Sequence, residues 1–224
     1  MKTKTTTLLV LLVFLLNTGF KKESGNNIFS NDPSTIDVNA KFNLVRSDDN
    51  ISIYTRWIPV TETRSTRQLK AEFVIDCSSE KVVSVLRDEK SYTKWMKATK
   101  TYYRLKTVNT NQWYSYVQFS IPWPLNNQDC ILKYEVHENT ELSRTEITLI
   151  GEPDFLQTYE GVERISHMEG SWVITQIGAG NKTRVEYLVY SKQAPKFPTW
   201  ITDPLIQKNL LKTMNAFRDI VKNS

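Results

Sequence analysis

Alternating segments between residues 99 and 192 constrain the fold of this chain more than any other sequence feature. Apolar and polar side chains alternate along each segment, and short turns rich in Asn and Gly separate most of them. Short turns join strands that run antiparallel, so the pattern predicts an antiparallel meander. The expected strands, with two that precede the run, are 51–58, 69–76, 101–109, 112–121, 129–138, 143–151, 170–178 and 183–192.

The same alternation assigns a face to each side chain of the expected sheet. In 129–138 the apolar side chains, including Leu132 and Tyr134, share one face, and the polar ones, including Asp129, share the other. One covered and one solvated face is typical of an antiparallel sheet, so we expect another element to pack over the apolar face.

The last segment of the chain is predicted to be a helix that packs over the apolar face of the sheet. Asp203 is expected to cap a helix that has Pro204 at its first position. An apolar stripe at helical spacing follows, made of Ile206, Leu210, Met214, Phe217 and Val221. Two short helices are expected at 78–88 and 88–96, after the third strand. The predicted fold is α+β, a helix-grip in which a curved antiparallel sheet wraps around a long C-terminal helix.

The N-terminal residues predict export. Lys2 and Lys4 precede the nine-residue apolar stretch 8–16, a pattern typical of a secretory signal peptide over residues 1–19. Residues 20–36 are expected to form a flexible leader, and 37–224 a single domain. The composition suits a bacterial envelope protein, with the periplasm as the expected compartment.

Other compositional features narrow the functional classes. The net charge of +5 is dispersed along the chain and indicates no nucleic-acid partner. Cys77 and Cys130 are the only cysteines, and both one disulfide and two buried thiols remain open. Neither has a second metal ligand nearby in the sequence, so no metal and no other cofactor is expected.

Four stretches in this order resemble the START family, the lipid-transfer domains related to steroidogenic acute regulatory protein. They are 48–58 (DDNISIYTRWI), 79–96 (SEKVVSVLRDEKSYTKWM), 119–129 (FSIPWPLNNQD) and 170–201, which ends in FPTWI. The third is most similar to the phosphatidylcholine-transfer-like branch. Gln128 departs from the arginine common in the family, and Tyr134 stands where a buried charge is frequent. A neutral Tyr134 suits a ligand with a single hydroxyl-type group better than a zwitterionic phospholipid head.

The resemblance implies a lipid or hydrophobic-ligand binding protein, a monomer that holds one apolar ligand between sheet and helix and visits a membrane surface transiently. Candidate cavity residues are Trp95, Tyr116, Leu132, Tyr134, Trp172, Ile174, Tyr187, Leu210, Met214 and Phe217. Candidate entrance residues are Trp123, in the rigid Pro-Trp-Pro corner, Phe155 and Trp200.

Two alternatives stay open. An enzyme of cyclase or hydrolase type would use Tyr134, Tyr187 or Glu160 as acid or base, although no catalytic constellation is found. A filled-core interaction module would have no cavity. The long connection 151–165 is expected to be a solvated loop, and its apolar residues leave open a flap over the cavity.

Overall fold

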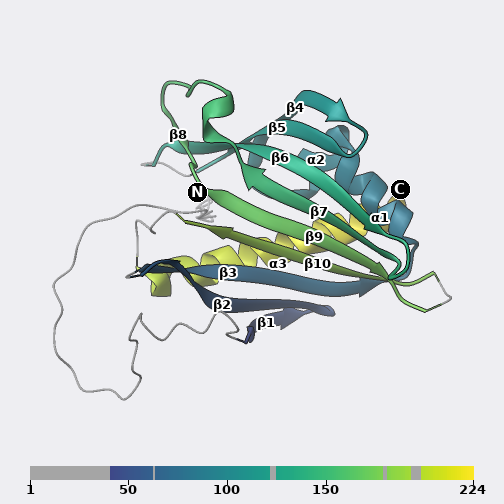
Figure 1. Cartoon of the computed structure of the whole chain (residues 1–224). Helices are drawn as coiled ribbons and strands as arrows, with labels where there is room; N and C mark the ends of the chain where they lie inside the picture. Colours follow the sequence, from purple (N-terminus) through teal and green to yellow (C-terminus); the bar gives the residue numbers. More distant parts are fainter. Residues whose placement is uncertain (1–40, 63, 122–124, 179–180, 193–197) are drawn as a thin grey trace, which may run out of the picture.

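A strongly curved antiparallel sheet surrounds the C-terminal helix in the computed structural model, which describes residues 41–62, 64–121, 125–178, 181–192 and 198–224 (Figure 1). The ten strands follow the order β1-β2-β3-β10-β9-β7-β6-β5-β4, and β8 pairs with β6 in parallel. Their bounds are β1 Asn43–Asp48, β2 Ile51–Thr61, β3 Arg64–Ile75, β4 Thr99–Asn109, β5 Gln112–Phe119, β6 Asn127–Asn139, β7 Arg144–Gly151, β8 Val162–Arg164, β9 Met168–Gln176 and β10 Thr183–Ser191. The predicted signal peptide and leader, and Trp123, lie outside the described residues.

The strands predicted from alternation are confirmed, and two short ones were not predicted. β1 pairs with β2 at one edge of the sheet and is mostly exposed, so it lacks the apolar alternation that identifies a half-buried strand. β8 has three residues, too few for any periodicity to be recognised. A helix-grip of the predicted α+β class is therefore the observed fold.

Two short helices follow β3, as predicted. The Ser78 side chain accepts a hydrogen bond from the backbone N–H of Lys81 at the start of α1 (Ser79–Arg87). Asp88 accepts from the backbone N–H of Lys90 at the start of α2 (Glu89–Trp95). Both are N-cap contacts that satisfy otherwise unpaired backbone donors.

The C-terminal helix α3 runs from Thr199 to Asn223, so it begins earlier than the predicted cap at Asp203. Pro204 lies inside the helix rather than at its first position. Asp203 therefore lies in the second turn of the helix rather than at its cap, and its carboxylate forms an ion pair with Arg67 on β3. The predicted stripe on α3 is otherwise confirmed: Met214, Phe217 and Val221 are fully buried against the concave face of the sheet.

The helices form a second layer on the concave side, and the connection between β7 and β8 lies on the other side (Figure 1). Within the described residues, no helix is long and apolar enough to cross a membrane. The same part of the chain holds no cluster of side chains arranged to bind a metal ion. Cys77 and Cys130 are both buried as free thiols, so they form no disulfide in this structure.

Candidate functional site

A small cavity lies between the sheet and the first half of α3, with a volume of about 70 Å³. α3 contributes Ile206, Asn209, Leu210 and Thr213, and α2 with the residues after it contributes Tyr92, Met96 and Lys97. The sheet side is lined by Leu69, Phe119, Leu132, Leu149, Met168, Tyr187 and Val189. Most of the lining is apolar, as it is in sites that bind hydrophobic ligands.

The burial of the lining residues shows which end of the cavity meets solvent. Lys97 is exposed, and Met96, Ile206 and Asn209 are half-buried. The remaining lining residues are buried. The mouth therefore lies between the end of α2 and the first half of α3.

Three of the predicted cavity residues line this space: Leu132, Tyr187 and Leu210. Five others, Trp95, Trp172, Ile174, Met214 and Phe217, are buried without lining it. Tyr134 lies beside it, paired in the sheet with the lining residue Leu149. The prediction of an inward-facing set is correct, but only part of that set meets the cavity.

Aromatic packing explains why the cavity stops halfway along α3. The Phe217 ring lies 5.0 Å from the rings of both Trp95 and Trp172, centroid to centroid. Trp172 also packs on Tyr187, at 4.4 Å. These contacts fill the space between the sheet and the second half of α3. The cavity therefore lies under the first half of α3.

Tyr116 and Phe155 lie on the outer face of the sheet, so the structure contradicts their predicted places in and beside the cavity. On β5, Tyr116 alternates with Ser115 and Val117, which face the helices. The outward Tyr116 ring stacks on Tyr103 at 5.0 Å. Phe155 stacks on Tyr114, the other outward tyrosine of β5, at 4.4 Å.

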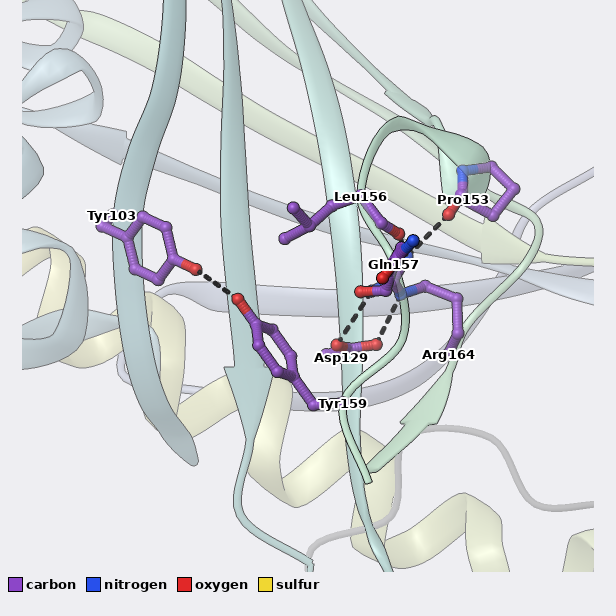
Figure 2. Close-up of polar contacts among 7 residues, drawn as sticks. All are labelled: Tyr103, Asp129, Pro153, Leu156, Gln157, Tyr159 and Arg164. Carbon is purple, nitrogen blue, oxygen red and sulfur yellow. Dashed lines mark hydrogen bonds and ion pairs between the residues drawn. The ribbon is translucent and has the colours of Figure 1, made fainter. Parts of the chain in front are cut away.

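The connection between β7 and β8 covers this outer face, so it is not a flap over the cavity. Arg164 holds it in place: its side chain donates to both carboxylate oxygens of Asp129 on β6, at 2.6 and 3.2 Å, and to the carbonyls of Pro153 and Leu156 (Figure 2). The Tyr159 hydroxyl lies 3.3 Å from that of Tyr103, which fixes a second point.

Asp129 was expected on a solvated face, and here it is fully buried. Its direction on the strand was predicted correctly, but the covering connection removes it from water. The sequence signal for this cover was the apolar trio Phe155, Leu156 and Tyr159 in an otherwise polar connection, because such residues need a surface to pack on.

Sequence reasoning missed Tyr92 as a cavity residue. It lies buried on α2, with its ring stacked on Tyr102 at 3.7 Å. The signal was present, since Tyr92, Trp95 and Met96 recur at helical spacing on one face of the second short helix.

The cavity tyrosines are uncharged over a wide pH range. Burial raises the pKa of Tyr187, and it raises the pKa values of Tyr92 and Tyr134 well above the ordinary value. Glu160, the third acid–base candidate, is exposed on the connection over the outer face and does not share the cavity with the tyrosines.

The predicted entrance residue Trp200 lies in the first turn of α3 and is 76% exposed. A second exposed tryptophan, Trp57 on β2, has the Arg67 guanidinium above its ring, and Arg67 is ion-paired with Asp203 of α3. Arg67 thus links the start of α3 to the β2–β3 hairpin.

An antiparallel sheet closed by a long C-terminal helix over an apolar cavity defines the helix-grip fold, and solved structures identify its type. The STAR-related lipid transfer protein of Xanthomonas axonopodis matches with a TM-score of 0.70 at 22% identity, over 81% of this chain and 98% of that one. Human StAR-related lipid transfer protein 5 matches with a TM-score of 0.67 at 12% identity, over 84% and 89%. Human STARD10 matches with a TM-score of 0.65 at 19% identity, over 82% and 75%.

The chain therefore has the fold of START domains, and the resemblance seen in the sequence is confirmed at the level of the fold. No protein-family model matches the sequence, and a search among curated proteins finds no match either.

Proposed function

We propose that this protein binds one lipid or other apolar molecule between the sheet and the first half of α3, and carries or sequesters it. The observation that carries this proposal is the apolar cavity under α3, in the place where the helix closes a START-type sheet. Removing apolar ligand surface from water supplies the binding energy, at roughly 25 cal/mol per Å².

Binding requires the cavity to enlarge. Sites for drug-sized ligands have volumes of roughly 300–1,000 Å³, several times the 70 Å³ present here. The first half of α3 is the element that can move outward, because its lining residues Ile206 and Asn209 are only half-buried. The second half is held by Phe217 in the aromatic cluster and by the ion pair of Arg218 with Asp49.

The proposed setting is the bacterial envelope, reached through the predicted signal peptide. The exposed Trp200 at the start of α3 suits brief contact with a membrane surface, because a tryptophan ring partitions into the interface between lipid and water. The protein acts as a monomer in this proposal, and binding needs no cofactor.

A vesicle extraction assay tests the proposal. The full chain is incubated with vesicles that contain a fluorescent fatty-acyl lipid, and the lipid recovered with the protein is measured. Leu210→Trp places an indole in the cavity and should lower recovery at least fivefold. Lys212→Trp adds the same bulk on the exposed side of the same helix and should leave recovery unchanged.

Leu149→Phe fills the cavity from the sheet side and provides a second variant if Leu210→Trp does not fold. Melting temperatures of all variants report on folding. Equal recovery by the wild type and both cavity variants, all folded, would contradict binding at this site.

A further inference from the structure

Exposed lysines surround the mouth of the cavity. Lys97 lines the mouth itself, and Lys94 precedes it in the last turn of α2. Lys100 follows near the start of β4, and Lys208 lies on the exposed side of α3. The backbone N–H of Lys97 donates to the Thr213 hydroxyl of α3 at 3.3 Å, so the end of α2 lies directly beside α3. Within the described residues, none of these four lysines forms an ion pair.

Lysines on the outer face of the sheet are arranged differently, because they lie next to carboxylates. The Lys70 ammonium lies 2.9 Å from a carboxylate oxygen of Glu72, and that of Lys133 lies 3.4 Å from one of Glu135. By contrast, the segment 90–108, which forms one side of the mouth, contains six Lys and Arg and no Asp or Glu. The positive charge around the mouth is therefore not balanced by acidic neighbours in its own segment.

Two exposed tryptophans lie at the end of the molecule where α3 begins. Trp200 is 76% exposed in the first turn of α3, and Trp57 on β2 is 49% exposed. Arg67 connects their neighbourhoods: its guanidinium lies 5.2 Å from the centre of the Trp57 ring, and it pairs with Asp203, one turn after Trp200. The start of α3 accordingly lies beside the β2–β3 hairpin (Figure 1). Exposed tryptophans near unpaired cations are typical of surfaces that bind lipid, since the ring enters the boundary between lipid and water.

We propose that this side of the protein docks on an anionic lipid surface. In this docking surface, Lys94, Lys97, Lys100 and Lys208 meet the acidic head groups, and Trp57 and Trp200 enter the interface. The inference rests on the proposed function and adds the chemistry of the membrane that supplies or receives the ligand. A lipid surface fits better than an acidic protein, because the charges surround the opening through which a lipid would pass.

The lysines act on binding to the membrane rather than on binding in the cavity. Each lysine close to an anionic leaflet strengthens binding to that leaflet roughly fivefold. Docking therefore speeds the encounter between cavity and membrane. The amount of ligand loaded at equilibrium does not change, because the membrane is not part of the loaded complex.

Vesicle flotation combined with loading kinetics tests the inference. The full chain is mixed at low salt with vesicles of phosphatidylcholine alone, or of equal parts of phosphatidylcholine and phosphatidylglycerol. Each kind contains the same fluorescent fatty-acyl lipid. Flotation measures the bound protein, and fluorescence follows the rate and final extent of loading. We expect at least tenfold tighter binding to the anionic vesicles, faster loading from them, and a preference that declines as salt is added.

Charge-matched variants locate the effect. Lys94→Gln combined with Lys208→Gln leaves the cavity lining unchanged and should lower the anionic preference roughly tenfold or more. Lys182→Gln combined with Arg184→Gln removes the same charge at the opposite end of the sheet, from side chains 55% and 51% exposed, and should keep the wild-type preference. Trp200→Ser should weaken binding to both kinds of vesicle and leave the preference intact.

The outcomes separate the inference from the proposed function. Equal binding to both kinds of vesicle, or a preference that survives in the folded Lys94/Lys208 variant, overturns the docking surface. An equal loss in the Lys182/Arg184 control also overturns it, because net charge alone would then explain the preference. Binding to no vesicle overturns it in favour of an acidic protein partner. In each case the proposed function stands if the lipid still loads at equilibrium, and absence of loading by folded protein contradicts that function.

Discussion

At the scale of single residues, Tyr134 and Tyr102 differ in how well their hydroxyls are hydrogen-bonded. The Tyr134 hydroxyl makes no hydrogen bond of good geometry, although the Tyr92 hydroxyl lies near it, whereas the Tyr102 hydroxyl lies 3.0 Å from the Ser115 hydroxyl. Tyr134→Phe should change the free energy of unfolding of delipidated protein by less than about 0.5 kcal/mol, because the contact with Tyr92 is a poorly aligned hydrogen bond. Tyr102→Phe should lower it by about 1 kcal/mol.

Urea denaturation of the two variants beside the wild type measures the difference. A loss in Tyr134→Phe as large as that in Tyr102→Phe would mean that the contact between the Tyr134 and Tyr92 hydroxyls is as strong as a well-aligned hydrogen bond.

Sequence alternation predicted the direction of individual side chains better than their surroundings. Leu132 and Tyr134 face inward and Asp129 outward, as the period of two requires. The same period could not show that Tyr134 would lie beside Tyr92 or that Asp129 would be covered. Both properties depend on segments distant in the sequence, α2 for Tyr134 and the β7–β8 connection for Asp129.

At the scale of elements, Arg164 is the attachment point of the β7–β8 connection. The side chains of Arg164 and Asp129 are 7% and 1% exposed, so removing one partner leaves a buried charge uncompensated. Arg164→Met should lower the free energy of unfolding by about 3 kcal/mol. It should also speed proteolysis within residues 152–164, because the variant loses the side-chain contacts to the carbonyls there.

Lys133→Met is the control, since Lys133 pairs with Glu135 on the same strand in a more exposed position, 24% and 40% exposed. It should cost no more than about 1 kcal/mol. Lipid loading should survive Arg164→Met wherever the variant is folded, because the connection lies on the face away from the cavity. Loss of loading in folded protein would contradict that placement.

The start of α3 and the β7–β8 connection show why helix boundaries and the packing of connections over a sheet are harder to predict than strands. The Asp-Pro pair at 203–204 is a good helix start in isolation, but Arg67 on β3 engages Asp203 and the helix begins at Thr199. The sequence of the connection 151–165 was compatible with a solvated loop and with a flap over the cavity. Its actual position on the outer face is set by the contact between Arg164 and Asp129, which are 35 residues apart in the sequence.

At the scale of the whole molecule, the buried tyrosines predict alkaline instability. Burial raises the pKa values of Tyr92, Tyr134 and Tyr187, so each stays protonated in the folded protein above pH 10, where the unfolded chain loses its protons. The unfolded state then binds fewer protons, and stability falls as pH rises. Each such tyrosine contributes about 1.4 kcal/mol per pH unit.

Urea unfolding between pH 9 and 11 checks this. The free energy of unfolding should be nearly level to pH 10 and fall steeply above it. Tyr187→Phe should make the fall shallower by the amount of one tyrosine. An equal slope in wild type and variant would show that Tyr187 titrates normally in the folded state.

The overall fold was predictable because its signals are long and repeated. Alternating strands with short turns and an apolar stripe on the last helix each span many residues, and together they specify a sheet closed by a helix. The cavity was less predictable, because its extent depends on how far Trp95, Trp172 and Phe217 fill the space under α3. Packing of this kind is set by volumes and contacts, which a periodic pattern does not encode.

Native mass spectrometry tests the central claim most directly. The full chain is produced with residues 1–19 in place, purified without detergent and measured intact, and the bound material is then extracted into solvent and identified. We expect one apolar molecule per protein chain, and its loss in Leu210→Trp. A protein mass with nothing bound, in the folded wild type after exposure to membrane lipids, would contradict the account of a lipid-binding protein.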